Sequence, residues 1–289
     1  IDGYRVDTVK HTEEFVWQEF KIECDYLFGE YKKNNPTKVL DDNDFYLVGE
    51  VYNYGISAGK EFNFGDKKVN YFDKAFNSLI NFEIKWNAKQ MEKEAVFYKY
   101  DSILNTNLKG YGVMNYMTSH DDGQPFDKDR SKPFETATML LLTPGTSQIY
   151  YGDESARDLT IEGAVGDATL RSNMNWDDIK NDNRTKEILA HWQKLGKFRK
   201  NHPAVGAGKH NMISETPYLF TRTFAKGNFT DKVLVGLDLS KGEKEINVGD
   251  FFEERSIVKD AYSGKTAKVV YGKIIIDTDA EIILLESND

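Results

Sequence analysis

Residues 1–202 alternate between short apolar runs typical of strands and longer segments whose apolar residues recur at helical spacing. The strand-like runs are residues 4–9, 45–51, 112–119 and 148–151, and the helical segments are residues 13–31, 89–104, 133–141 and 185–200. The apolar segment 75–82 fits either a strand or a helix. Because this alternation is typical of a parallel sheet whose strands are joined by helices, we predict an α/β fold for this part.

The pattern changes after Pro203. Short β runs follow, separated by turn residues and without helical periodicity, at residues 218–224, 232–239, 244–248, 256–259, 273–277 and 281–285. Such a series is typical of an antiparallel all-β unit. We therefore predict two domains, an α/β domain at residues 1–203 and a small antiparallel β-sandwich domain at residues 204–289.

Three acidic residues, Asp7, Glu50 and Asp121, stand at the carboxyl ends of predicted strands, 43 and 71 residues apart. A (β/α)8 barrel uses about 30 residues per unit, so the first gap fits one unit with a loop insertion and the second fits two. Strand ends in such a barrel meet at one rim, which predicts three carboxylates in one cleft. Taken alone, Asp7 could be a loop acid or a helix cap. Glu50 follows Gly49 on an apolar strand, and a buried glutamate needs a partner or a functional reason.

Carboxylates gathered in one cleft suit the hydrolysis of glycosides. One ionised carboxylate attacks the anomeric carbon, and a second, with a raised pKa, protonates the leaving oxygen and then activates water. In retaining enzymes these two groups are about 5–5.5 Å apart. A third carboxylate nearby can raise the pKa of the acid through like-charge repulsion.

Five segments, in this order and spacing, resemble conserved regions of the α-amylase family of glycoside hydrolases. They are GYRVDTVKH at residues 3–11, VGEV at 48–51, SHDD at 119–122, QIYYGDE at 148–154 and LRSNMNWD at 170–177. Ser119 stands where the family often has Asn. The resemblance implies a (β/α)8 (TIM) barrel whose fourth to eighth strands lie in residues 1–203, followed by the family's β-sandwich. The earlier strands and their conserved motif are expected upstream of Ile1, so the sheet should have two open edges.

The resemblance also implies the catalytic roles. Asp7 would be the nucleophile and Glu50 the general acid/base. Asp121 would bind sugar hydroxyls and stabilise the distorted ring. Arg5 would pair with Asp7 and keep it ionised, although a structural ion pair is the alternative for Arg5. His120 would hydrogen-bond hydroxyls of the sugar that is cleaved.

Two further residues are implied on the leaving-group side of the site, Lys10 and His11. In calcium-dependent members of the family the backbone carbonyl at the position of His11 also binds a structural Ca²⁺. The other Ca²⁺ ligands are mostly expected upstream of Ile1.

The implied activity is retaining hydrolysis of α-1,4-glucosidic bonds in starch, glycogen or maltodextrins. An α-glucan transglycosylase or cyclomaltodextrinase would use the same carboxylates. A non-catalytic amylase-like binding subunit is the alternative from another class, but such relatives commonly lose the carboxylates that are present here. An unrelated β/α-barrel hydrolase would not contain the five motifs together.

Composition excludes several other classes. The formal net charge is −9, and no basic face for nucleic acid is evident. No apolar run reaches the roughly 18 residues of a membrane span. The single cysteine, Cys24, allows no internal disulfide and does not indicate a compartment. An extracellular or periplasmic location is the favoured expectation.

Other polar residues near the motifs have structural explanations. We expect Asp122 to be a solvated loop acid, and His191, His202 and His210 to be surface or packing residues. Asp153 and Glu154 fit either the site or structural pairing near the barrel rim.

Overall fold

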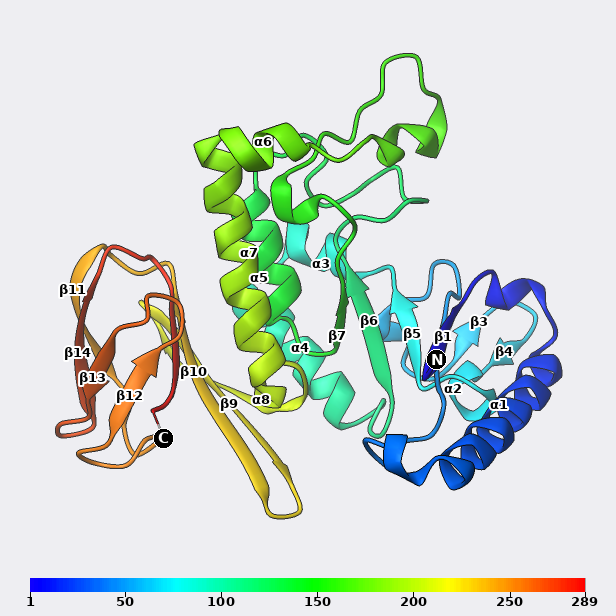
Figure 1. Cartoon of the computed structure of the whole chain (residues 1–289), viewed down its shortest axis with the longest axis horizontal. Coiled ribbons are helices and arrows are strands. Elements are labelled where there is room, and N and C mark those ends of the chain that lie inside the picture. Colours follow the sequence, from blue (N-terminus) through cyan, green and yellow to red (C-terminus); the bar gives the residue numbers. More distant parts are fainter. Residues whose placement is uncertain (289) are drawn as a thin grey trace.

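The computed structural model describes residues 1–288, and its first half is built on a five-stranded parallel sheet (Figure 1). The strands lie in chain order, β1-β2-β5-β6-β7, so β1 and β7 are the two edges. The prediction of an α/β fold with a parallel sheet is confirmed. The bounds are Gly3–Val6 (β1), Tyr46–Gly49 (β2), Ser78–Asn81 (β5), Gly112–Tyr116 (β6) and Thr146–Gln148 (β7).

Helices join these strands, and a two-stranded hairpin follows β2. The helices that precede β7 are α1 (Glu14–Asn34), α2 (Tyr71–Lys74), α3 (Ile84–Gln90), α4 (Lys93–Asn105) and α5 (Pro133–Leu142). Those after β7 are α6 (Trp176–Asn181), α7 (Asn183–Asn201) and α8 (Pro203–Ala207). The hairpin consists of β3 (Phe62–Asn63) and β4 (Lys68–Val69).

Several predicted boundaries need correction. The ambiguous segment 75–82 contains the strand β5, and the predicted helix 89–104 is divided between α3 and α4, because Met91 is extended with φ −125° and ψ 150°. The predicted strand 148–151 lies earlier, as β7. The segment after Pro203 contains one short helix, α8.

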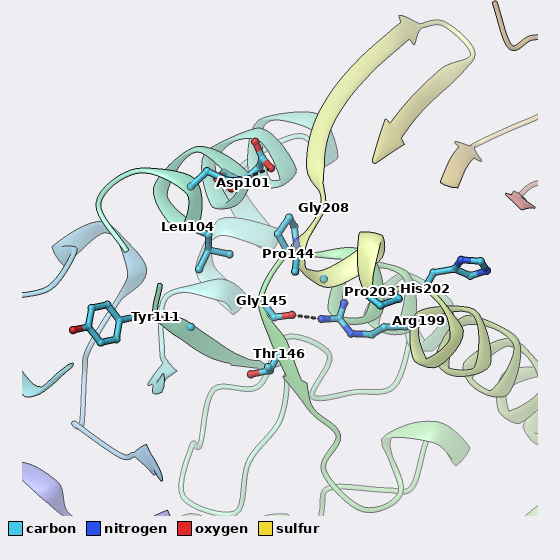
Figure 2. A pocket seen from close by; sticks show the side chains of 14 residues that line it. Asp101, Leu104, Tyr111, Pro144, Gly145, Thr146, Arg199, His202, Pro203 and Gly208 are labelled. Carbon is cyan, nitrogen blue, oxygen red and sulfur yellow. Dashed lines mark hydrogen bonds between the residues drawn. The ribbon is translucent and has the colours of Figure 1, made fainter. Parts of the chain in front are cut away.

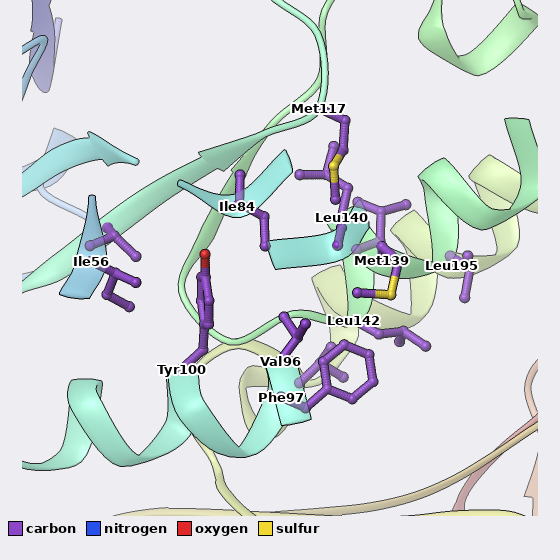
Figure 3. Packing of buried hydrophobic residues seen from close by; sticks show 14 of the residues in the cluster. Ile56, Ile84, Val96, Phe97, Tyr100, Met117, Met139, Leu140, Leu142 and Leu195 are labelled. Carbon is purple, nitrogen blue, oxygen red and sulfur yellow. The ribbon is translucent and has the colours of Figure 1, made fainter. Parts of the chain in front are cut away.

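Alternate residues of the sheet face opposite sides, as the pleat of a β-strand requires. Leu47, Leu79 and Val113 belong to the main core beneath the helices. Figure 3 shows part of this core, including Val96 of α4 and Leu140 of α5. Val48, Ile80 and Tyr116 form a separate small cluster on the opposite face. Since cross-strand partners in register share a face, this second face is a continuous surface across β2, β5 and β6.

The last part of the described chain, from Lys209 onward, is antiparallel, as predicted. A six-stranded sheet has the order β13-β12-β15-β10-β9-β8, and β11 pairs with β14. Thirteen buried apolar residues from both sheets form a core of their own. The bounds are Lys209–Glu215 (β8), Tyr218–Lys226 (β9), Phe229–Leu237 (β10), Gly242–Asn247 (β11), Ile257–Asp260 (β12), Thr266–Lys268 (β13), Lys273–Thr278 (β14) and Ile283–Ser287 (β15).

The main core continues across residue 203. It includes Phe97 from α4 and Leu195 from α7 together with Phe220 and Val233 from the antiparallel sheet. Residues before and after Pro203 therefore pack in one hydrophobic core, although the type of secondary structure changes there. The division into residues 1–203 and 204–289 as two domains stays a prediction.

A half-buried cluster of charges ties α7 and α8 to the antiparallel sheet. His202 contacts Asp231 of β10 through Nδ1 at 2.8 Å and Glu286 of β15 through Nε2 at 2.7 Å. Asp231 also accepts a hydrogen bond from the amide of Ala204 at 2.8 Å, and Lys259 of β12 donates to Glu286 at 3.0 Å. His202 is thus a packing residue between the two kinds of sheet.

No helix among residues 1–288 combines the length and the apolar character needed to cross a membrane.

The cluster predicts an acid-sensitive contribution to stability. Burial raises the pKa of Glu286, but hydrogen bonds from His202 and Lys259 outweigh it and hold the pKa below its ordinary value of 4.5. A carboxyl group with a lowered folded-state pKa stabilises the fold above its unfolded value, and this stabilisation is lost as the pH falls through the folded value. Glu286→Gln should therefore cost about 1.5–3 kcal/mol at pH 7, the range for hydrogen bonds to charged groups.

Thermal unfolding at pH 7 and at pH 3 measures this difference. We expect the gap between the wild type and Glu286→Gln to narrow at pH 3. Glu281→Gln, at an exposed position of the same sheet connection, is the matched control. A gap that stays the same at both pH values contradicts the prediction.

Candidate active site

The register of the parallel sheet places the predicted site residues on one face. Arg5 pairs with Val48 across β1 and β2, and Glu50 lies two residues beyond Val48 on the same side. Ile80 pairs with Met114, and Tyr116 pairs with Gln148. Side chains from all five strands therefore project from the face opposite the helices.

These side chains line a cavity of about 220 Å³ at the carboxyl ends of the strands. The cavity brings together four of the predicted residues, Arg5, Glu50, His120 and Asp121. Of the three carboxylates predicted to share one cleft, Glu50 and Asp121 line this cavity and Asp7 does not. The complete lining is Arg5, Glu50, Ile80, Phe82, Tyr116, Ser119, His120, Asp121 and Gln148.

Asp7 lies beside this cavity and is linked to it through Arg5. The guanidinium of Arg5 pairs with the Asp7 carboxylate, and its other terminal nitrogen lies 3.5 Å from Glu50 Oε2. Glu50 Oε2 also accepts a hydrogen bond from the amide of Thr8 at 3.1 Å. The side chain of Asp7 is 60% exposed and that of Glu50 only 10%.

The pKa values of the two carboxyl groups move in opposite directions. A hydrogen bond with Glu50, followed by the hydrogen bond from Arg5, lowers the pKa of Asp7. Burial raises the pKa of Glu50, and its hydrogen bond with Asp7 adds to the rise against the opposing hydrogen bond from Thr8. The charged form is therefore favoured for Asp7 and disfavoured for Glu50. This is the division of roles that a nucleophile and a general acid need.

Asp121 lies in the loop that follows β6 and has two side-chain partners, His120 and Arg171. His120 Nε2 is 2.8 Å from Asp121 Oδ2, and Arg171 donates to Asp121 Oδ1 at 2.8 Å. Arg171 also donates to the backbone carbonyl of His120 at 3.3 Å. Sequence reasoning missed Arg171, although it lies in the fifth motif at residues 170–177.

Comparisons with known proteins give the chain a family. No family model matches it. Over 237 residues the chain is 37% identical to the periplasmic α-amylase of Escherichia coli strain K12, and the match covers 81% of this chain and 32% of that protein. The maltogenic α-amylase of Bacillus acidopullulyticus is 25% identical over 259 residues, covering 85% of this chain and 38% of that protein. The chain belongs to the α-amylase family.

Solved structures of α-amylases have the same fold over the whole chain. The Anoxybacillus α-amylase matches with a TM-score of 0.62 at 22% identity, covering 100% of this chain and 60% of that one. The Geobacillus thermoleovorans α-amylase, solved with acarbose, matches with a TM-score of 0.62 at 18% identity and covers 100% and 61%. This chain spans about a third of the length of the curated relatives it matches.

Lys10 and His11, the two residues that the α-amylase family implies on the leaving-group side, lie outside the lining of the cavity. Both belong to a short 3-10 helix, Val9–His11. Lys10 Nζ donates to the carbonyl of Tyr52 at 3.4 Å and lies 5.0 Å from the centre of the Tyr52 ring. His11 is exposed. Their roles toward substrate stay predictions.

The Ca²⁺ that the α-amylase family implies finds no complete set of ligands in the described residues. Calcium takes about six to eight oxygen ligands. Among residues 1–288, no group of three or more His, Cys, Asp or Glu side chains is placed to hold a metal ion.

A larger cavity, of about 390 Å³, lies at the amino ends of β6 and β7 (Figure 2). Its guanidinium, from Arg199, donates to the carbonyls of Leu141 at 2.8 Å and Thr143 at 3.1 Å, and also to that of Gly145. Its carboxylate, from Asp101, accepts a hydrogen bond from the amide of His210 at 2.9 Å. Both charged groups are thus already hydrogen-bonded to the protein backbone. In β/α barrels, residues at the amino ends of the strands usually contribute to stability and not to catalysis.

Asp153 and Glu154 have structural roles. Asp153 is buried and forms an ion pair with Arg130 at 2.8 Å. Glu154 accepts a hydrogen bond from the amide of Gly152 at 2.9 Å. Of the two explanations given above for these residues, structural pairing is the one that the contacts favour.

The contacts of Arg5 predict its effect on the titration of the site. Arg5→Leu removes the hydrogen bond and the positive charge that lower the pKa of Asp7, so this pKa should rise. An NMR-detected pH titration of the aspartate side-chain carboxyl carbons measures it. Arg171→Leu, which removes a guanidinium from Asp121 instead, should leave the titration of Asp7 unchanged. An Asp7 pKa that is equal in Arg5→Leu and wild type would contradict the assignment.

Proposed function

We propose that the chain is part of a retaining glycoside hydrolase that cleaves α-1,4-glucosidic bonds in starch, glycogen or maltodextrins. The observation that carries this proposal is the pair formed by Asp7 and Glu50 at adjacent strand ends, whose pKa values are shifted in opposite directions. The shift of Asp7 favours a nucleophile and that of Glu50 favours a general acid.

In the proposed first step a carboxylate oxygen of Asp7 attacks the anomeric carbon, and the bond from that carbon to the leaving sugar breaks. The leaving oxygen takes the proton of Glu50. In the second step water attacks the anomeric carbon of the covalent glycosyl-enzyme, Glu50 takes a proton from that water, and the Asp7 carboxylate is released.

The two carboxyl groups are placed differently for this chemistry. Asp7 is the exposed partner, and Glu50 is fixed by the amide of Thr8. In the proposal the exposed carboxylate of Asp7 reaches the anomeric carbon, and Glu50 stays in place beside the glycosidic oxygen.

The remaining predicted residues have supporting roles in the proposal. Arg5 keeps Asp7 ionised. Asp121 and His120 bind hydroxyls of the sugar at the cavity, and Lys10 and His11 lie toward the leaving group. The backbone carbonyl of His11 stays a proposed Ca²⁺ ligand, with the other ligands expected upstream of Ile1.

An α-glucan as substrate is supported by the relatives. Three curated relatives are named α-amylases, and two solved structures with the same fold are described as complexes with maltose and maltotriose. Transglycosylation or action on cyclomaltodextrins is the second candidate, because one relative is a maltogenic α-amylase and one structural neighbour is a cyclomaltodextrinase. The non-catalytic alternative is disfavoured because Asp7, Glu50 and Asp121 are all present.

The proposed architecture is the fourth to eighth strands of a (β/α)8 barrel at residues 1–203, followed by a β-sandwich domain at residues 204–289. A periplasmic or extracellular location completes the proposal, since one relative is named a periplasmic α-amylase.

Asp7→Asn tests the proposed nucleophile in the full-length protein. An amide of the same shape attacks poorly, so turnover of maltoheptaose should fall on the order of 10⁴-fold or more, the scale seen when a nucleophile or its activating group is lost. Asp2→Asn, at an exposed position just before β1, is the matched control and should keep wild-type turnover. Retention of more than a few per cent of turnover by a folded Asp7→Asn protein rules out Asp7 as the nucleophile.

Glu50→Gln tests the proposed general acid/base. Turnover of ordinary glucans should fall by about 10²–10⁴-fold, the typical contribution of general acid–base catalysis. A substrate with an activated leaving group needs no proton in the first step, so it should retain reactivity, and added azide should rescue the second step. Equal losses on both kinds of substrate would mean that Glu50 has only a structural role.

A further inference from the structure

Asp122 is not the solvated loop acid expected from its sequence context. Its Oδ2 accepts a hydrogen bond from the ammonium of Lys85 and another from the hydroxyl of Tyr116 at 2.8 Å. Its Oδ1 accepts from the amide of Gln124 at 3.1 Å. The side chains of Lys85 and Asp122 are only 6% and 13% exposed.

These contacts join the ends of two neighbouring strands. Lys85 lies in the first turn of α3, directly after β5, and Tyr116 is the last residue of β6. Asp122 lies in the loop that follows β6. Lys85 therefore connects the segment after one strand to the loop after the next.

Burial of such a pair needs a reason beyond stability. Removing two charges from water is costly, and well-packed apolar residues in place of a buried ion pair are often as stable or more stable. Lys85 and Asp122 together with Tyr116 satisfy each other, as buried charges must. Unlike apolar residues, the pair supplies hydrogen bonds of defined direction, which fix one point of the loop.

That point is adjacent to the proposed substrate-binding residues. Asp122 follows His120 and Asp121 in the chain, and the side chains of these two are about 40% exposed at the cavity. The link to Lys85 fixes the loop on one side, and Arg171 contacts it on the other. Lys85 also neutralises Asp122, so the cavity rim does not gain a further unpaired negative charge beside Asp121.

We infer that Lys85 and Asp122 are positioning residues, which hold the loop so that His120 and Asp121 face Glu50 across the cavity. This inference rests on the proposed function for its kinetic consequence. Neither residue lines the cavity, so both act through the loop. Displacement of a catalytic group by about 1 Å can cost on the order of 10²-fold in rate.

The test compares four variants of the full-length protein with wild type. Lys85→Met breaks the link and leaves a buried charge. Lys85→Met with Asp122→Asn breaks the link without that charge, so it provides a folded form if the single variant unfolds. Lys85→Arg keeps the ion pair. Lys99→Met is the matched control, because Lys99 pairs with Glu83 at 2.5 Å on the same layer of helices without touching the loop.

Kinetics on maltoheptaose, well below each unfolding temperature, give the first readout. We expect kcat to fall about 10- to 100-fold in Lys85→Met and in the double variant, with KM changed less than about threefold. Lys85→Arg should recover most of kcat. Lys99→Met should lower the unfolding temperature and leave kcat unchanged. An unchanged kcat in the folded double variant, or an equal loss in Lys99→Met, overturns the inference.

Amide hydrogen exchange gives a second readout that does not depend on activity. The amide of Gln124 donates to Asp122, so it and its neighbours in residues 118–124 should exchange faster in the double variant but not in Lys99→Met. If the wild type has no activity on any glucan, the proposed function is wrong. The hydrogen-exchange rates still test whether Lys85 and Asp122 hold the loop in place. Unchanged exchange in residues 118–124 overturns that role whatever the activity.

Discussion

The parallel register between β1 and β2 is the constraint on which the site depends. It sets Arg5 opposite Val48, so that Arg5 and Glu50 project from the same face of the sheet. A slip of one residue in this pairing would turn one of the two toward the helices and bury an unpaired charge in the main core. The register is fixed from both sides, because Leu47 fills the apolar core beneath the helices while Val48 packs on the opposite face.

The two ends of the sheet use positively charged side chains in different ways. At the amino ends, Arg199 donates to backbone carbonyls near the end of α5, and Arg222 does the same toward Leu142 and Val205. These arginines satisfy carbonyls that a helix end leaves free. At the carboxyl ends, Arg5 and Lys85 pair with carboxylates instead. Positively charged side chains therefore stabilise helix ends at the amino ends of the strands. At the carboxyl ends of the strands they balance the carboxylates in and around the cavity.

The sequence was informative where a strand end and a motif coincided. Asp7, Glu50 and Asp121 could be placed because each follows an apolar run, and the parallel order of the strands follows from their alternation with helices. The weakly apolar strands β8 and β13 could not be predicted, since their side chains are largely exposed and polar. Their pairing comes from neighbours that are distant in sequence.

The contacts of the loop after β6 were equally out of reach. Asp122 looked solvated because its partner Lys85 lies 37 residues earlier, between a segment of ambiguous type and a predicted helix. Arg171 was in view within a motif, but only the folded chain brings it to Asp121. Helical spacing predicted α1 correctly. Its degree of burial does not follow from that spacing, and none of its residues is buried in the structure.

Different contacts account for the different environments of the two proposed catalytic carboxyl groups. The side chain of Asp7 is exposed and pairs with the guanidinium of Arg5. The side chain of Glu50 is shielded and accepts a hydrogen bond from the amide of Thr8. Desolvation penalises the charged form and raises the pKa of Glu50, whereas the hydrogen bonds of Asp7 favour its charged form. Two neighbouring strand ends can therefore carry carboxyl groups of opposite tendency, because each carboxyl group has its own partners and its own degree of burial.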